Sequence, residues 1–446
     1  MNKKIFLALF LMIYCSQIQA QSGFHFFGKN TKQVSFRYQL INNLMVIPLT
    51  INGKSTSFIL DTGANKTIVF NVAKNENIEL NDTEKITLQG LGSGEPVSAL
   101  LSKNNSIKIK EFSSSSQDVY VISSDIFDVS GRMGVTIHGV IGYHIFKDAI
   151  VHVNYASQKI TLYNPKTYTR KNCKRCQTFP LQFYNNKPYI DVKVQLDSLN
   201  DQRTDVKLLV DSGGSSSLWL FENTKDEIQT PKNHFRAVLG EGLSGTIYGN
   251  KSRIKGLDIG SFHIKSPTVS FLDSISTNYA RQFSSRNGSI GGNILKRFKL
   301  WIDYKNKKIT FKKNGSFRGG FEYNMSGIDV VYNGKVLVRE VSKGMPSDTD
   351  LSGVGTDINT IRLVTNYTYK FKPSFRVEKV LLNSPAYHAG IQKDDIILSI
   401  NGTKVYELTL SQITAIFQEK HQRKVKMIIE RRGVQKRFEF RLIREI

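Results

Sequence analysis

Cysteine and acidic side chains are scarce in this chain, and long hydrophobic runs are confined to its beginning. The 446 residues include 3 Cys, and 37 Asp and Glu stand against 62 Lys and Arg. With so few cysteines a zinc site would need further ligands, and no histidine pair follows at a suitable spacing. After the first 20 residues no run is long enough to cross a membrane. We therefore expect no metal, no cofactor and no transmembrane segment once the amino terminus is removed.

The first 20 residues have the features of an export signal. A basic start precedes an apolar stretch over residues 5–14, and a suitable cleavage point follows Ala20. The alternatives are a retained anchor and a lipoprotein acylated on Cys15, where the preceding Tyr14 is bulkier than lipidation signals require. We expect a signal peptide over 1–20 and an exported protein of the periplasm, the cell surface or the extracellular space.

Two cysteines remain after signal removal, and both lie in a connector rich in Lys, Arg and Asn. The Cys-x-x-Cys spacing of Cys173 and Cys176 suits redox chemistry, half a zinc site or a small disulfide. A thioredoxin-like motif would need a βαβ context, which this connector lacks. In an exported protein a local disulfide is the expected state.

Positive charge is spread along the whole chain. The formal net charge is +25, and the Lys and Arg are not gathered in a tail or in one helix. A basic surface favours anionic membranes, polysaccharides or nucleic acid. No segment resembles a nucleic-acid-binding module, so we interpret the charge as a solvated surface with a preference for acidic partners other than nucleic acid.

The residue pattern predicts a mostly β protein of more than one domain. Short runs of Ile, Val, Phe, Tyr and Thr are broken by 33 glycines and by clusters of Asn, Ser and Asp. A content of 40% hydrophobic and 11% aromatic residues is typical of globular proteins. The length exceeds what one core holds, so two or three domains are expected.

One short motif occurs twice. Residues 58–64 read Phe-Ile-Leu-Asp-Thr-Gly-Ala, and residues 208–214 read Leu-Leu-Val-Asp-Ser-Gly-Gly. Each copy leads an apolar strand into an Asp, a hydroxyl residue and a glycine. A single copy would be ordinary turn chemistry. Two copies predict that a duplicated fold brings Asp61 and Asp211 together, an arrangement that shares one proton and activates a water.

Further landmarks recur at nearly the same offset. An apolar-Gly segment occupies residues 139–142 and again 288–291, and two strands joined by an Asn/Lys-rich turn follow each copy. A period of this length indicates two homologous lobes rather than a solenoid. We place lobe 1 at 34–165 and lobe 2 at 178–314.

Each lobe also has a Gly-rich turn at the same distance from its acid. Gly90 and Gly240 each follow the Asp of their own lobe by 29 residues. Such glycines suit a mobile hairpin tip that lies over a ligand, although a plain structural turn would look similar. The candidate flap residues are Gly90, Gly92, Gly240 and Gly242.

At these residues the chain resembles the aspartic proteases of the pepsin and retropepsin type. In that family an apolar strand ends in Asp-Thr/Ser-Gly, and a later apolar-apolar-Gly segment threads beside it. Both halves of this pattern are present in each lobe. The resemblance implies a bilobal pair of β-barrels and catalysis by Asp61 and Asp211. It implies supporting roles for Thr62, Gly63, Ser212 and Gly213, whose hydroxyl and N–H groups would hold the two loops and the carboxylates.

The chemistry explains why two acids are needed. Two carboxylates a few ångströms apart cannot both ionise cheaply, so one pKa rises and the other falls. The ionised member takes a proton from water, and the neutral member donates one to the peptide carbonyl oxygen. Which of them is the base is a property of the coupled pair.

The chain departs from the pepsin pattern three residues after each acid. Pepsin-like enzymes usually have Ser or Thr there, where the hydroxyl supports the carboxylate, whereas this chain has Ala64 and Gly214. Losing that support should raise the pKa values of the pair. We therefore predict a pH optimum nearer neutral than gastric.

From about residue 318 the pattern changes. Residues 384–402 resemble the core motif of PDZ domains, which bind an extended peptide as an added strand. Ser384 is placed to cap a short helix and Gly390 to end it. Leu410, Ile413 and Phe417 follow at the helical spacing of a PDZ groove helix.

We place the PDZ-like domain at 318–446, with its core at about 366–446. Residues 318–370 either open this domain or form an insert before it. The loop by which PDZ domains hold a terminal carboxylate corresponds to residues 371–375, which contain no glycine. Docking of an internal strand or of another part of the chain is therefore open, as is a domain that only braces the lobes.

The sequence thus predicts a mostly β fold: a bilobal pepsin/retropepsin-like β-barrel pair followed by a C-terminal PDZ-like α+β domain. The predicted function is that of an exported aspartic endopeptidase of bacterial type, with peptide or protein substrates and a PDZ-like domain that binds peptide segments. The alternative is a non-catalytic peptide-binding scaffold that uses the same lobes and groove. A third interpretation is binding to an acidic polymer through the surplus positive charge.

Overall fold

The computed structural model describes residues 23–28, 31–70, 78–90, 94–122, 129–196, 202–242, 245–342 and 366–446. The predicted signal peptide, residues 1–20, and the candidate flap residue Gly92 lie outside these residues. The chain divides into two compact units, one built mainly from residues up to 322 and the other from residues 323–444. In the described part of the chain, no helix has both the length and the apolar character to cross a bilayer.

Strands account for 52% of the structure and helices for 10%, which confirms the predicted mostly β fold. The strands follow from alternation of apolar and polar side chains. In β8 (Val97–Ile109), for example, both ends of the strand alternate buried apolar residues with more exposed ones. The α-helices among the described residues are short: α3 (Val129–Met133), α4 (Tyr143–Asp148), α5 (Ser274–Thr277), α6 (Gly292–Leu295), α7 (Pro385–His388) and α8 (Leu410–Phe417).

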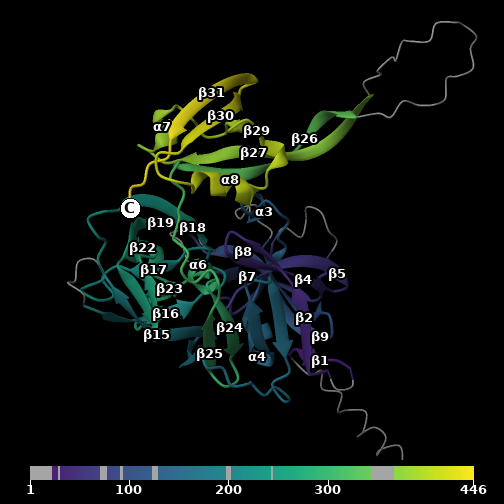
Figure 1. The fold of residues 1–446 in the computed structure, drawn as a ribbon. Helices are drawn as coiled ribbons and strands as arrows, with labels where there is room; N and C mark the ends of the chain where they lie inside the picture. Colours follow the sequence, from purple (N-terminus) through teal and green to yellow (C-terminus); the bar gives the residue numbers. More distant parts are fainter. Residues whose placement is uncertain are drawn as a thin grey trace, which may run out of the picture. The chain divides into compact units, whose positions relative to one another are not determined.

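Lobe 1, drawn in purple to blue in Figure 1, is a barrel whose strands close on themselves. The strand order is β1-β9-β6-β10-β5-β4-β8-β7, with β3 beside β4, and β8 also pairs with β9 to complete the ring. The bounds are β1 (His25–Phe26), β3 (Gln39–Ile41), β4 (Leu44–Ile51), β5 (Lys54–Leu60), β6 (Thr67–Phe70), β7 (Thr83–Leu88), β8, β9 (Phe112–Ile122) and β10 (Gly139–Ile141).

Lobe 2, drawn in teal, repeats this plan with the order β18-β19-β22-β17-β23-β16-β15-β20-β21 and with β14 beside β15. The long β8–β9 hairpin of lobe 1 is here interrupted on both arms. The bounds are β14 (Gln182–Tyr184), β15 (Lys187–Gln195), β16 (Thr204–Val210), β17 (Leu218–Phe221), β18 (Phe235–Gly242), β19 (Gly245–Arg253), β20 (Gly256–Ile259), β21 (Phe262–Lys265), β22 (Thr268–Leu272) and β23 (Gly288–Ile290).

A six-stranded sheet joins the two lobes, in the order β13-β25-β24-β11-β12-β2. Its centre is the antiparallel pairing of β11 with β24, from Val151 opposite Ile302 to Asn154 opposite Lys299. One apolar core runs through both lobes beneath these sheets. The bounds are β2 (Gln33–Arg37), β11 (Ile150–Asn154), β12 (Lys159–Tyr163), β13 (Cys176–Pro180), β24 (Phe298–Asp303) and β25 (Lys308–Lys313).

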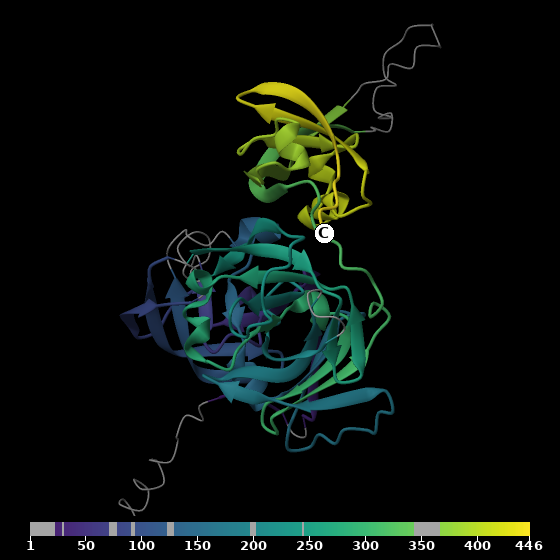
Figure 2. The ribbon, with the colours of Figure 1, turned by 90° about the vertical axis from the view of Figure 1, so that its left-hand side faces the viewer.

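The second unit is a separate sheet with two helices, drawn in green to yellow in Figure 2. The order is β26-β27-β28-β30-β31, with β29 beside β28. Because β26 pairs with β27 along its length, residues 328–342 open this sheet and are not an insert before it. The bounds are β26 (Ile328–Ser342), β27 (Asn366–Val380), β28 (Ile396–Ile400), β29 (Thr403–Lys404), β30 (Lys424–Arg431) and β31 (Val434–Arg441).

The helix signals of the sequence lie where they were expected in the second unit. The Ser384 hydroxyl accepts a hydrogen bond from the Tyr387 N–H and caps α7. In α8, Leu410, Ile413 and Phe417 are all buried. The interpretation of residues 371–375 as a loop is wrong, because they lie inside β27 and pair with β26.

The cysteine pair in the connector is oxidised. Cys173 and Cys176 form a disulfide, as the sequence predicted for an exported protein. The bridge closes a short turn directly before β13 and adds no link between distant parts of the chain.

Candidate active site

Asp61 and Asp211 follow the equivalent central strands of the two lobes. β5 pairs in parallel with β10, and the Asp61 N–H donates to the Ile141 carbonyl at 2.9 Å. In lobe 2, β16 pairs in parallel with β23, and the Asp211 N–H donates to the Ile290 carbonyl at 2.9 Å. The apolar-Gly segments found in the sequence therefore hold the two acids.

Reciprocal hydrogen bonds between Thr62 and Ser212 join the two acid loops. The Thr62 Oγ1 donates to the Val210 carbonyl at 2.6 Å and accepts from the Ser212 N–H at 2.9 Å. The Ser212 Oγ donates to the Leu60 carbonyl at 2.9 Å and accepts from the Thr62 N–H at 3.0 Å. Both hydroxyl residues are buried. Each lobe thus completes the hydrogen bonding of the other, and the acids are brought to one place.

The two motif glycines donate to a single carboxylate oxygen. The Gly63 N–H lies 2.6 Å and the Gly213 N–H 3.1 Å from Oδ1 of Asp61. An ideal Cβ on Gly213 would lie 2.3 Å from Cγ of Asp61, so only glycine fits there. An ideal Cβ on Gly63 would lie 3.2 Å from Oδ1 of Asp61 and 3.4 Å from Oδ1 of Asp211, which places both carboxylates at this point.

The pair retains its proton at higher pH than isolated carboxyls do. Burial, and then the charge of Asp211, raises the pKa of Asp61 to about 7, against the lowering effect of its N–H donors. Burial also raises the pKa of Asp211. The direction agrees with the one expected from Ala64 and Gly214, but the main cause is desolvation rather than a missing hydroxyl.

Two cations that the sequence analysis did not single out act on this pair. Arg286 and then Lys187 are the nearby charges that lower the pKa of Asp211, and Lys187 also lowers that of Asp61. Arg286 precedes β23 and is 3% exposed, whereas Lys187 begins β15 and is partly exposed. Both come from lobe 2. The repeat of the apolar-Gly segments pairs Arg286 with the apolar Ile137 in the sequence itself, and this contrast could have found Arg286. Only the strand register of the structure matches Lys187 with Leu44.

Further contacts tie the lobes together beside the acids. The Tyr304 hydroxyl at the end of β24 donates to the Thr62 carbonyl at 3.2 Å. The Asn43 amide donates to the Ser215 carbonyl, and in the opposite sense the Asn65 amide donates to the Asn185 carbonyl. These pairs repeat the twofold relation seen in the acid loops.

The Gly-rich turns lie at hairpin ends in both lobes. Gly90 follows β7 in the β7–β8 hairpin, and Gly240 and Gly242 lie in β18 of the β18–β19 hairpin. The two hairpin ends approach each other, since an ideal Cβ on Gly245 would be 3.9 Å from the backbone nitrogen of Gly94. Gly90, Gly240 and Gly242 therefore lie near the facing ends of two hairpins, one from each lobe.

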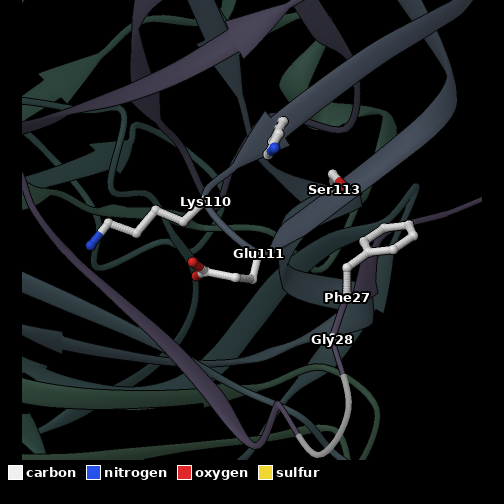
Figure 3. Close-up of a pocket in the computed structure, with 6 residues that line it drawn as sticks. Phe27, Gly28, Lys110, Glu111 and Ser113 are labelled. Atoms are coloured by element: carbon white, nitrogen blue, oxygen red, sulfur yellow. The ribbon is translucent and has the colours of Figure 1, made fainter.

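A surface hollow at the β1–β9 edge of lobe 1 is separate from the acids. Figure 3 shows it with the Phe27 ring, Lys110 and Glu111. It contains one carboxylate and no partner acid, so it is not the candidate site. Among the described residues, no three His, Cys, Asp or Glu side chains gather closely enough to hold a metal ion.

Comparison with known protein families recognises two segments. Residues 47–145 match the family described as aspartyl protease, and residues 376–431 match the PDZ domain family. A search of curated proteins found no match to this chain. The first segment contains Asp61 and ends before Asp211, so the assignment of the second acid depends on the internal repeat. The chain joins an aspartyl protease domain to a C-terminal PDZ domain.

Proposed function

We propose that the protein is an exported aspartic endopeptidase in which Asp61 and Asp211 activate one water for attack on a peptide bond. The observation that carries the proposal is the reciprocal hydrogen bonding of Thr62 and Ser212. Those bonds join the residues that directly follow Asp61 and Asp211, and so hold the two acid loops against each other. Two carboxyl groups held together in a buried setting can share one proton.

The reaction follows from one proton on the pair. The ionised carboxylate takes a proton from the water while the water oxygen bonds to the peptide carbonyl carbon. The protonated carboxyl gives its proton to the carbonyl oxygen, so a neutral tetrahedral diol forms. The first carboxyl then protonates the nitrogen, the C–N bond breaks, and a diol proton returns to the second carboxylate. The products are a carboxylic acid and an amine, and the dyad returns to its starting state.

The pKa directions favour activity closer to neutral pH than in gastric enzymes. Because the pKa of Asp61 is raised to about 7, the pair still holds its one proton when the solution approaches neutrality. Above that pH the proton is lost and hydrolysis should decline. An activity profile that peaks below about pH 4 would contradict this part of the proposal.

We propose that the PDZ domain binds peptide segments along β26. This strand is one edge of its sheet, and α8 packs against it. An extended peptide added at such an edge is held by backbone hydrogen bonds, and the neighbouring helix supplies side-chain pockets. Export remains part of the proposal, supported by the amino-terminal sequence and by the disulfide.

The test is cleavage of a peptide library by the full chain from pH 3 to 9, read by mass spectrometry. Asp61→Asn and Asp211→Asn should each reduce cleavage by about a hundredfold or more, because each removes a proton-transfer group. Asp205→Asn, at an exposed lobe 2 residue paired with Lys193, is the matched control and should cleave normally. Cleavage that survives either dyad substitution would disprove the proposal. Peptide binding without cleavage by the native chain would support the scaffold alternative.

A further inference from the structure

The two lobes present unlike walls beside the dyad. Side chains alternate between the two faces of a strand, so residues two apart point to the same face. Ile59 therefore shares a face with Asp61, and Leu209 shares a face with Asp211. In lobe 2 the row across four strands at that position is Tyr189, Leu209, Ser289 and Trp219. In lobe 1 the matching row is Val46, Ile59, Val140 and Ile68. One wall is wholly apolar and the other carries polar groups.

Arg286 stands where lobe 1 has Ile137. The register is fixed by the residue that follows each of them: the His138 N–H donates to the Ser57 carbonyl at 2.8 Å, and the Asn287 N–H donates to the Lys207 carbonyl at 2.9 Å. Arg286 is 3% exposed and Ile137 is 2% exposed. A buried cation in lobe 2 therefore replaces a buried aliphatic side chain.

The polar groups of the lobe 2 wall hold this guanidinium. Its Nη2 donates to the Ser289 Oγ at 2.8 Å, and its Nε to the Gly288 carbonyl at 3.2 Å. The guanidinium carbon lies 5.0 Å from the centre of the Phe221 ring and 6.0 Å from the centre of the Tyr189 ring. Lobe 1 offers Val140 and Val46 in place of the serine and the tyrosine.

Arg286 has neutral partners and no carboxylate of its own. No ion pair joins it to an acidic side chain within the described part of the chain. A buried cation without a counter-ion is costly, so its charge acts on a buried acid close to it. The Ser289 that holds the guanidinium lies beside Leu209, two residues before Asp211 on the same strand path. In agreement, Arg286 and Asp211 each shift the pKa of the other toward its charged form.

Lys187 adds a second positive charge on the same side. It follows the Asn185–Asn186 turn, as Leu44 follows Asn42–Asn43 in lobe 1. Lys187 lies two residues before Tyr189 and so shares its face. Its charge acts on both acids, whereas that of Arg286 acts chiefly on Asp211.

We infer that Arg286 is a positioning residue that keeps the negative charge of the dyad on Asp211, so that Asp211 is the base and Asp61 carries the proton. The inference depends on the proposed proteolytic function and deepens it. In the reaction above, the water proton goes to Asp211, and the proton from Asp61 goes to the carbonyl oxygen.

The other titratable groups around the dyad do not reverse this assignment. Tyr189 from β15 and Tyr304, which directly follows β24, are kept neutral by burial, which raises the pKa of each. Tyr143 from α4 faces Tyr304. The positive charges that act on the pair, Arg286 and Lys187, both belong to lobe 2.

The decisive experiment titrates each acid alone in the full chain. Carboxyl ¹³C NMR of Asp-labelled Asp61→Asn protein reports the pKa of Asp211, and Asp211→Asn protein reports that of Asp61. The double variant identifies the signals by their loss. We expect the pKa of Asp211 to be lower than that of Asp61 by about one unit or more. Equal values, or the reverse order, would overturn the inference.

Substitution of the arginine then identifies the cause of the gap. In the Asp61→Asn background, Arg286→Met should raise the pKa of Asp211 and close most of the gap, whereas Arg286→Lys should retain it. Arg297→Met is the matched control, because Arg297 is equally buried, held by backbone carbonyls and stacked on Phe321. A gap that survives Arg286→Met, or closes equally in the control, would contradict the inference.

Kinetics provide a second measurement in the active protein. Arg286→Met should move the acidic limb of the kcat/KM profile to higher pH, and Arg286→Lys should restore it. Loss of activity without a shift of the limb would indicate a merely structural role and would overturn the inference. The NMR titration needs no turnover, so failure of the proposed proteolysis and failure of this charge assignment give different results.

Discussion

Lobe 1 and lobe 2 are alike where they meet and unlike one layer behind that point. At the meeting point each supplies an Asp, a buried hydroxyl residue and a glycine, and the hydrogen bonds run in matched pairs. Behind it, lobe 1 is lined with aliphatic side chains, and lobe 2 buries an arginine among a serine, a tyrosine and a phenylalanine. Two lobes related by pseudo-twofold symmetry in their backbones can therefore differ in the buried charge that they place beside the two acids.

The largest expected effect comes from copying the lobe 2 charge into lobe 1. Ile137→Arg would bury a guanidinium where Val140 and Val46 offer no acceptor. We expect a loss of unfolding free energy of about 3–5 kcal/mol, the range found when a buried charge is left uncompensated. Urea denaturation measures it. Ile137→Met, which nearly conserves volume, should cost less than about 1.5 kcal/mol, and equal losses for the two variants would refute the contrast between the walls.

The next largest effect concerns the feature that the two lobes share, the buried hydroxyl group that follows each Asp. Thr62→Val and Ser212→Ala each leave a buried N–H and a buried carbonyl without their hydroxyl partner. Each should lower the unfolding free energy by about 2–4 kcal/mol, at about 1–2 kcal/mol for each unsatisfied group. Thermal and urea unfolding should show similar losses for both. A large loss of unfolding free energy for one variant and none for the other would show that the two hydroxyl groups do not contribute equally to joining the lobes.

A smaller effect concerns stability against pH. In the folded state the pKa of Asp61 is raised to about 7, above its unfolded value, so folding favours the protonated form. The resulting stability is complete at low pH and is lost as the pH rises from about 4 to about 7. Asp61→Asn has no proton to lose, so its advantage over the native chain should grow on the order of 2 kcal/mol between pH 4 and pH 8.

The same measurement sharpens the comparison of the lobes. Asp211 lies beside both cations, so Asp211→Asn should gain less stability at pH 8 than Asp61→Asn does. Denaturation curves at pH 4, 6 and 8 for both variants test this, with Asp205→Asn as the surface control. A greater gain for Asp211→Asn would reverse the assignment of the buried charge.

The smallest effect concerns Lys187. This side chain is partly exposed, and it lowers the pKa of both acids. Lys187→Leu makes the position match Leu44, so both limbs of the kcat/KM profile should move to higher pH by roughly half a unit, as expected of a solvent-screened charge. Movement of the acidic limb alone would mean that Lys187 acts as Arg286 does.

The sequence alone predicted the parts of the molecule that depend on local pattern. The repeat around Asp61 and Asp211 was visible because apolar strands, a turn and a hydroxyl residue recur in order. Ser384 and the buried positions of α8 were visible for the same reason, since capping and helical spacing are local signals. These features predicted the two lobes, the two acids and the PDZ domain.

The parts that were missed depend on contacts between distant residues. Arg286 is one of 62 Lys and Arg, and nothing adjacent to it in sequence shows that it is buried. Its partners Tyr189 and Phe221 come from other strands. The resemblance to PDZ domains assigns residues 371–375 to the carboxylate-binding loop by their position before the core motif, whereas pairing with the distant β26 keeps them extended.

The β11–β24 pairing has a consequence for how the protein can be assembled from parts. The β11–β24 pairing joins residues before position 165 to residues after position 176, and so do the four hydrogen bonds made by the Thr62 and Ser212 hydroxyl groups. Only the connector between them links the halves covalently. Two separately expressed fragments, cut within that connector, carry complementary strand edges and one acid each. Neither fragment is complete, so mixing them would bring Asp61 and Asp211 together at a chosen moment.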